Sequence, residues 1–205
     1  MSQGTLRRSL GMTALGLVLA GPMVWAQDAP VRVRGTIERV DGGIYIVKAR
    51  DGAELKLKLA PNAAVVSLIQ ASLADIKQGS YVGVAGMPLA DGTQRALEVH
   101  IFPEAMRGTG DGHRGWDLKP SSTMTNGNVE QTTASSDGQM LTLKYKDGQK
   151  RILVPPGIPI VLYVPGDVSE LKAGARIFVS AATKQPDGTL QAARVNVGRG
   201  VAPPM

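Results

Sequence analysis

Residues 100–118, HIFPEAMRGTGDGHRGWDL, concentrate the side chains of this protein that could perform chemistry. The segment contains both histidines of the chain and one of its two tryptophans. Imidazole nitrogens and carboxylate oxygens are ligands for zinc, nickel and copper. The segment is therefore a candidate site for a divalent transition metal. The candidate ligands are His100, Glu104, Asp111, His113 and Asp117.

The same segment can instead be a strap that joins two domains. Its candidate ligands lack the close spacing of a zinc finger, and its glycines lose conformational entropy when the loop closes around an ion. In this interpretation Phe102 and Trp116 anchor the strap on the domains, and Arg107 and Arg114 pair with nearby carboxylates. We favour the strap and keep the metal as the alternative, so no cofactor is otherwise expected.

The chain lacks the sequence motifs of common enzyme classes. It has no cysteine nucleophile, and no Gly-x-Ser-x-Gly elbow, P-loop or dinucleotide-binding glycine pattern occurs in it. Several acidic residues precede glycine in turns such as Asp41-Gly42 and Asp147-Gly148, where the carboxylate binds its own backbone. We therefore expect that the protein is not an enzyme.

Residues 1–26 have the composition of a cleavable signal peptide. Arg7 and Arg8 precede an apolar run, and Val24 and Ala26 stand where a signal peptidase reads the chain. The run is shorter than the ~20 apolar residues of a membrane span. We expect cleavage after Ala26 and a periplasmic or secreted protein that does not span the membrane. Sec and twin-arginine export both remain open.

Three segments of the first half recur in the second half at an offset of about 95 residues. Residues 34–61 are similar to residues 126–156, and SLADIKQGSYVGVAG (72–86) is similar to DVSELKAGARIFVSA (167–181). DGTQRALEVHI is likewise similar to DGTLQAARVNV. The recurrence predicts a tandem duplication.

Each copy has the pattern of three strands, one short helix and two further strands. Apolar and polar residues alternate over residues 55–59 and 141–145, and turn residues bound these runs. Ser72 and Asp167 can each cap a short helix, because an acidic residue follows three positions later. This order of elements is that of the OB-fold, a five-stranded barrel. We therefore predict an all-β protein with two tandem OB-like five-stranded barrels, each carrying one short helix.

The composition argues against a nucleic-acid partner. Single strands bind on aromatic platforms above a basic groove, and only 4% of the residues are aromatic. The formal net charge is +6, and two of these charges belong to the leader. Tyr45 and Tyr145 fall on the second strands of their copies and are kept as a possible ligand face.

The segments LADIKQGSYVGVAG and VSELKAGARIFVSA, with a Gly-x-[IV] strand opening and an Asp-Gly turn, resemble bacterial exported OB-like domains of unknown function. The FPEAMRG…GHR…WDL centre and the PPM end are similar to those of proteins labelled as metal ABC transporter permeases. A permease needs several membrane helices, and only the leader of this chain is hydrophobic enough. The resemblance therefore implies a fold and a compartment but no catalytic residues.

The expected organisation has five parts along the chain. They are the signal peptide (1–26), a first OB-like repeat (30–103), an inter-repeat strap (104–122), a second OB-like repeat (123–198) and a flexible tail (199–205). We expect an exported binding or interaction module of the cell envelope, acting on an envelope protein or a ligand that the sequence does not identify. The alternative is a periplasmic metal-handling accessory protein that uses residues 100–117.

Overall fold

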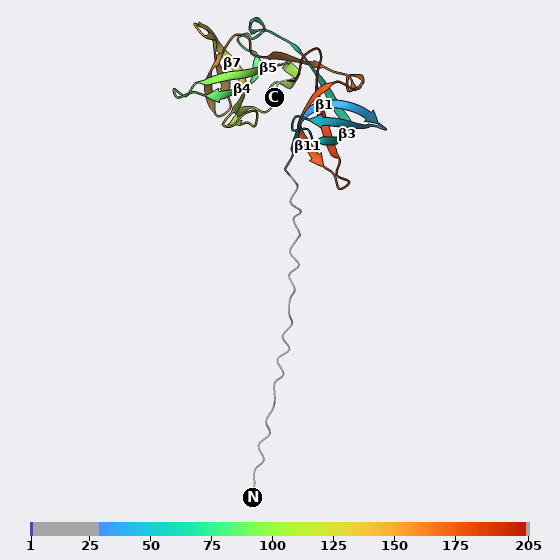
Figure 1. The fold of residues 1–205 in the computed structure, drawn as a ribbon. Coiled ribbons are helices and arrows are strands. Elements are labelled where there is room, and N and C mark those ends of the chain that lie inside the picture. Colours follow the sequence, from blue (N-terminus) through green and yellow to red (C-terminus); the bar gives the residue numbers. More distant parts are fainter. Residues whose placement is uncertain (2–28, 204–205) are drawn as a thin grey trace.

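The computed structural model describes Met1 and residues 29–203 (Figure 1). Apart from Met1, the predicted signal peptide lies outside the described residues. The described part consists of strands and turns, and its helical elements are single 3-10 turns. None of these turns has the length and apolarity of a membrane-crossing helix. The all-β class predicted from the sequence is confirmed.

Twelve strands follow one another along the described chain. Their bounds are β1 Val31–Asp41, β2 Ile44–Ala49, β3 Glu54–Gln70, β4 Tyr81–Pro88, β5 Gln94–Phe102, β6 Gly112–Gly115, β7 Thr123–Ser135, β8 Gly138–Tyr145, β9 Gly148–Val154, β10 Ile160–Pro165, β11 Arg176–Lys184 and β12 Leu190–Gly198. The 3-10 turns are η1 Leu73–Asp75, η2 Glu104–Met106 and η3 Val168–Glu170.

Strands β1, β2, β3, β12 and β11 close into a first barrel. β2 pairs antiparallel with β1 and β3, and β11 pairs antiparallel with β1 and β12. The circuit closes where β12 runs parallel to β3, with Leu190 opposite Leu57 and Val197 opposite Ser67. The first barrel thus combines the first three strands of the chain with its last two. Figure 1 shows these blue and red strands together in one lobe.

Strands β4, β5, β9, β8 and β7 form a second five-stranded circuit, which we call the second barrel. Antiparallel pairs join β5 to β4, β4 to β7, β7 to β8 and β8 to β9. A short parallel contact of β5 with β9 closes the circuit, with Gln94 opposite Ile152 and Arg95 opposite Leu153. The short strand β6 adds to β7 from the outside of this circuit.

This pairing differs from the expected division of the chain into barrels at 30–103 and 123–198. Each barrel takes three strands from one half of the chain and two strands from the other half. Alternating sequence patterns specify the two faces of a strand, but they do not specify which edge the strand joins. Two halves with similar edges can therefore exchange strands, as in domain swapping.

Strand β10 and the C-terminal part of β3 connect the two barrels. They pair antiparallel, with Tyr163 opposite Leu68 and Val161 opposite Gln70. β10 then runs parallel to β5, with Val161 opposite His100. The two barrels therefore belong to one continuous hydrogen-bonded sheet.

One backbone contact recurs at matching places in the two barrels. The Ile37 amide donates to the Ala175 carbonyl at 2.9 Å, and the Ile37 carbonyl accepts from the Gly174 amide at 2.8 Å. In the second barrel Val129 has the same two partners at 2.8 Å each, Ser80 and Gly79. In both barrels the glycine that follows the 3-10 turn, and the residue after that glycine, form hydrogen bonds to the middle of a long strand, β1 or β7.

The expected short helices are present as 3-10 turns, with the predicted caps. The Ser72 amide and hydroxyl both donate to the Asp75 carboxylate at 2.8 Å, and Asp167 and Glu170 form the same reciprocal cap. Each turn ends at one residue, Ile76 or Leu171, whose side chain is buried. Burial of this side chain takes the chain out of the helical direction after three residues.

Three apolar clusters hold the structure together. Two fill the interiors of the barrels, around residues such as Ile37 and Val179 in the first and Val84 and Leu143 in the second. The third lies between the barrels. Its buried members are Val66, Leu68, Ala85, Met124, Val161, Tyr163 and Phe178, with Phe102, Met106, Trp116, Leu118 and Val201 packed against them.

The segment expected to be a flexible tail packs on the molecule as far as the structure describes it. The Arg199 amide donates to the Leu68 carbonyl at 2.9 Å, and the Arg199 guanidinium pairs with Glu170 at 2.8 Å. This pairing lowers the pKa of the Glu170 carboxyl to about 2, together with a hydrogen bond from Ser67 and against a smaller desolvation effect. Pro203 is buried. Residues 199–203 are therefore held in place by the Arg199 ion pair, by Val201 packed on the third cluster and by the buried Pro203, and they are not the expected flexible tail.

Glycines 35 and 127 provide a test of close strand packing. A Cβ at Gly35 would overlap the Lys48 carbonyl, and a Cβ at Gly127 would overlap the Lys144 carbonyl. We expect Gly35→Ala and Gly127→Ala each to lower the free energy of unfolding by about 1–3 kcal/mol, because an overpacked site must distort. Urea titration measures this. Gly115→Ala is the matched control, since its Cβ would meet no atom within 4 Å.

A specific protease site inserted between Lys119 and Pro120, which are exposed, tests the exchange of strands. We expect the two cleaved fragments to co-elute in native size-exclusion chromatography at the volume of the uncut chain. They separate only in denaturant, because neither fragment contains all five strands of a barrel. The uncut insertion variant is the control. Two separately eluting folded fragments would show that each half makes its own barrel.

Candidate functional site

A cavity of about 200 Å³ lies where the outer faces of the two barrels meet. The second barrel contributes residues of β5 and β7, the first barrel contributes residues of β11 and β12, and the strap covers one side. We call it the inter-barrel cavity. Its lining residues are His100, Phe102, Met106, Thr109, Gly110, Arg114, Trp116, Met124, Asn126, Tyr163, Phe178, Ser180, Arg194 and Asn196.

Aromatic rings form much of the cavity wall. The Phe102 and Tyr163 rings are stacked, with centroids 4.8 Å apart and an interplanar angle of 7°. His100 meets Tyr163 edge to face at 5.8 Å. Trp116 from the strap and Phe178 from β11 add two further rings. A planar guest would find both stacking and edge contacts on such a wall.

Several residues that line the cavity have buried polar atoms without a hydrogen-bond partner. Four such side-chain atoms belong to lining residues. Each such atom costs about 1–3 kcal/mol if it stays unpaired. They are Nε2 of His100, Nε1 of Trp116, Oδ1 of Asn126 and Oδ1 of Asn196. A polar guest could relieve this cost after small side-chain adjustments.

Arg114 brings positive charge to the strap side of the cavity. Its guanidinium donates to the Gly110 carbonyl at 2.7 Å and lies 5.7 Å from the centre of the Trp116 ring. Arg32 lies over the same ring at 4.2 Å. Burial, and then the charge of Arg32, lower the pKa of Arg114. An anion beside Arg114 would offset both effects.

The strap bridges the two barrels. Trp116 and Asp117 follow β6, which pairs with β7 of the second barrel, yet their partners are on β1 of the first barrel. Asp117 accepts from Arg34 at 2.7 and 3.2 Å and pairs with Arg32 at 3.1 Å. These bonds lower the pKa of the Asp117 carboxyl. The predicted pairing of Arg114 with a carboxylate is wrong, because the arginines of β1 take that carboxylate.

The other end of the strap is fixed to the second barrel. Arg107 pairs with Glu104 at 2.6 and 2.7 Å, as expected, and lowers the pKa of that carboxyl. Asp111 accepts from the Lys146 amide at 2.8 Å and from the Tyr81 hydroxyl at 3.3 Å. Phe102 stacks in the cavity wall. Phe102, Arg107 and Trp116 therefore lie where the strap region contacts the barrels.

The five candidate metal ligands do not come together. In the described residues no group of three or more His, Cys, Asp or Glu side chains is placed to hold an ion. Glu104, Asp111 and Asp117 have the partners given above, and the Nδ1 atom of His113 lies 2.7 Å from the Thr125 hydroxyl. His100 lies in the inter-barrel cavity instead. Sequence spacing placed these side chains within reach, but the strap runs across the surface and separates them.

His100 is fully buried, and burial lowers its pKa to about 3. Its Nδ1 atom lies 3.5 Å from the Tyr163 hydroxyl, and its Nε2 atom lies 3.6 Å from a Glu98 carboxylate oxygen. Burial also raises the pKa of Tyr163, with the Glu98 charge as the next cause. The imidazole is therefore neutral throughout the physiological range and can act as a hydrogen-bonding group for a guest.

The two tyrosines proposed as a ligand face have different environments. Tyr45 is buried in the core of the first barrel. Tyr145 is half-buried and stacks on His113 with ring centroids 6.4 Å apart. The two rings do not share a surface, since each lies on a different barrel, so they do not form the expected ligand face.

Sequence reasoning missed several residues of the cavity. Tyr163 and Phe178 look like core residues of apolar strands, and Asn126 and Asn196 look like ordinary strand polars. One signal was available: Asn196 occupies the position that matches His100 in the other half, and both are polar within apolar strands. Two polar residues at matching positions within apolar strands, on the faces opposite the barrel cores, indicate a buried polar surface outside the barrels.

Comparison with known proteins yields no match for this chain among protein-family models, curated proteins or solved structures. The ligand is therefore inferred from the geometry of the site.

The neutral His100 makes stability depend on pH. Because its pKa is lower in the folded state than the ordinary 6.5, the folded protein binds fewer protons than the unfolded chain. The contribution of neutral His100 to the free energy of unfolding is complete above pH 6.5 and is lost as the pH falls toward 3. We expect the free energy of unfolding to fall by up to about 1.4 kcal/mol per pH unit below that pH. Urea titration between pH 7 and pH 5, above the range in which most carboxylates titrate, measures the slope.

His100→Asn should remove most of this slope, because asparagine already occupies the matching position 196. His113→Gln is the control: its ring is only partly buried, so the slope should largely remain. An unchanged slope in His100→Asn would contradict the assignment.

Proposed function

We propose that the protein is an exported binding module of the cell envelope, built from two OB-like barrels, and that its ligand is a small anionic ring compound held in the inter-barrel cavity. The signal-peptide pattern of residues 1–26 supports export to the periplasm or the exterior. The single observation that carries the ligand proposal is a cavity walled by aromatic rings and lined by two arginines and no acidic side chain.

The matching contacts support a tandem duplication as the origin of the fold. Ile37 and Val129 have equivalent backbone partners, and Gly35 and Gly127 each lie against a lysine carbonyl. The first half has three strands, a 3-10 turn and two strands, which is the order of the OB-fold, and the second half has the same order with one further strand, β10, before its turn. In this proposal the two copies exchange their last two strands. The exchange presses two outer barrel faces together and creates the cavity.

The size and lining of the cavity define the class of ligand. A cavity of about 150 Å³ can bind benzene, so the 200 Å³ here suits one substituted six-membered ring. The stacked Phe102 and Tyr163 rings provide a flat apolar surface. Arg114 and Arg194 line the cavity and no acidic side chain does, which favours a carboxylate on the ring.

The alternative function, metal handling through residues 100–117, has no observation in its favour. Its five expected ligands are separated, and each has a hydrogen-bond or ion-pair partner in the protein. We therefore do not carry this function further.

Isothermal titration of the purified chain with benzoate tests the proposal. We expect one site per chain and weaker binding of benzamide, which has the same ring without the charge. Arg194→Gln and Arg114→Gln should each weaken benzoate binding about tenfold or more, because a charged hydrogen bond contributes about 1.5–3 kcal/mol. Melting temperatures confirm that the variants fold.

Arg95→Gln removes an equal charge from an exposed position of the second barrel, away from the cavity, and should bind benzoate normally. Benzoate binding that is absent in the unmodified protein, or that Arg95→Gln weakens as strongly as Arg194→Gln, would contradict the proposal.

A further inference from the structure

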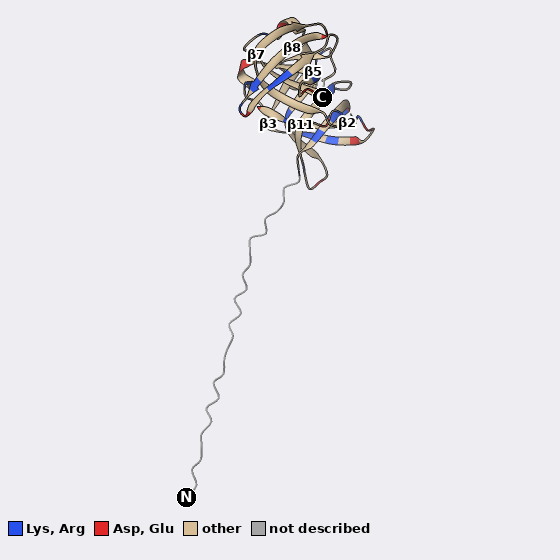
Figure 2. Ribbon diagram, turned by 90° about the vertical axis from the view of Figure 1, so that its left-hand side faces the viewer, with Lys and Arg blue, Asp and Glu red and all other residues tan. Residues whose placement is uncertain are grey.

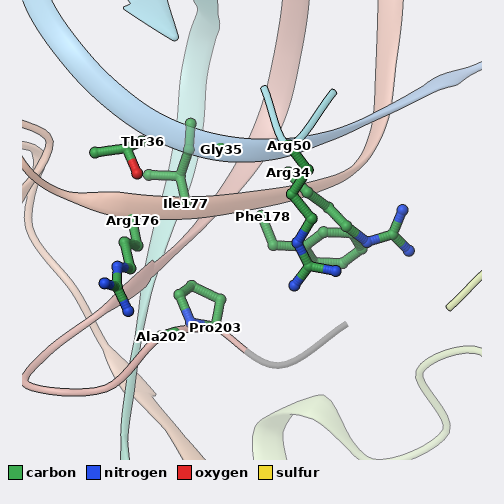
Figure 3. Close-up of a pocket in the computed structure, with 9 residues that line it drawn as sticks. All are labelled: Arg34, Gly35, Thr36, Arg50, Arg176, Ile177, Phe178, Ala202 and Pro203. Carbon is green, nitrogen blue, oxygen red and sulfur yellow. The ribbon is translucent and has the colours of Figure 1, made fainter. Parts of the chain in front are cut away.

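A second pocket lies on the outer face of the first barrel, next to the C-terminal segment. It has a volume of about 230 Å³ and is lined by Arg34, Gly35, Thr36, Arg50, Arg176, Ile177, Phe178, Ala202 and Pro203. We call it the arginine pocket. Figure 3 shows the guanidinium groups of Arg34 and Arg50 beside the Phe178 ring, with Arg176 and Pro203 farther along the same side of β1.

Strand pairing brings these arginines together. Arg34 lies opposite Phe178, and Thr36 lies opposite Arg176, in the ladder between β1 and β11. Because alternate residues of a strand share a face, these four side chains project from the outside of the barrel. Arg50 joins them through its amide, which donates to the Arg34 carbonyl at 3.1 Å.

The positive charge of the pocket is only partly balanced. Arg34 pairs with Asp117, but Arg50 and Arg176 have no carboxylate partner within the described residues, and the lining contains no acidic side chain. The Nε atom of Arg34 is also buried without a hydrogen-bond partner. About two positive charges therefore remain for a guest, together with one unused buried donor.

The equivalent position on the second barrel shows which chemical group binds at a site of this geometry. Register alignment places Asn126 at the position of Arg34, Tyr81 at that of Arg176 and Lys146 at that of Arg50. There the Asp111 carboxylate fills the position, accepting from the Lys146 amide at 2.8 Å and the Tyr81 hydroxyl at 3.3 Å. In the second barrel the strap itself thus supplies an anion.

We propose that the arginine pocket binds a phosphate group, as free phosphate or as a phosphate monoester, at the position that Asp111 occupies in the second barrel. No segment of the described chain places a carboxylate in the arginine pocket. A phosphate group carries about −1.5 to −2 charges at neutral pH, which matches the remaining charge of the pocket. Guanidinium groups bind phosphate oxygens in paired hydrogen bonds.

The pocket is separate from the inter-barrel cavity. Only Phe178 lines both, and its ring stands between them. The phosphate proposal therefore does not depend on the benzoate proposal, and each has its own arginine variants.

Titration of the full chain with inorganic phosphate, followed by calorimetry at low ionic strength, tests the proposal. We expect one site, with acetate binding at least tenfold more weakly because it carries a single charge. Arg50→Gln/Arg176→Gln should weaken phosphate binding at least tenfold. Arg95→Gln/Arg151→Gln is the matched control, because it removes two exposed charges from the second barrel.

Phosphatidylcholine vesicles with and without phosphatidic acid separate the two sources of phosphate. Cosedimentation that requires phosphatidic acid and is lost in Arg50→Gln/Arg176→Gln assigns the site to a lipid head group, whereas binding of free phosphate alone assigns it to a soluble anion. Either result supports the pocket. The proposal is overturned if neither probe binds, if acetate binds as tightly as phosphate, or if both double variants weaken binding equally.

Discussion

The antiparallel pairing of β10 with the C-terminal part of β3 is the contact on which the rest of the structure depends. β10 belongs to neither five-stranded circuit and runs parallel to β5, whereas the C-terminal part of β3 also runs parallel to β12 of the first barrel. Buried backbone groups must be hydrogen-bonded. Pairing at Leu68 and Tyr163 meets this requirement and fixes the distance between the barrels. Each half can then deliver its last two strands to the barrel that the other half began.

The exchanged strands determine which surfaces become buried. The outer faces of β4, β5, β11 and β12 meet. These faces are neither fully polar nor fully apolar. The result is a mixed interface in which Leu68, Met124 and Phe178 pack beside His100, Asn126 and Asn196. Apolar contacts there stabilise the arrangement, whereas the unpartnered polar atoms reduce its stability. Binding surfaces characteristically contain polar groups that have no partner within the protein and therefore lower its stability.

The strap makes the two barrels unequal. Its first part, around Asp111, fills a position on the second barrel, and its last part, Trp116 and Asp117, reaches across to Arg32 and Arg34 of the first. Figure 2 shows basic residues on both parts of the molecule. In the first barrel, three arginines line a pocket that the strap leaves unfilled. The strap thus places a carboxylate at this position in the second barrel and leaves the arginine pocket of the first barrel open.

Local interactions explain what the sequence by itself determined. The all-β class follows from alternation and turn residues, the capped turns follow from Ser72 with Asp75 and from Asp167 with Glu170, and the pairing of Arg107 with Glu104 follows from their spacing. Each of these depends on residues only a few positions apart. Only the tertiary structure decided the partners of Asp117, the separation of the histidines, the order around Arg199 and the exchange of strands between halves. Strand edges and ion pairs far apart in sequence have several equivalent partners, and the choice among them is made by packing of the whole chain.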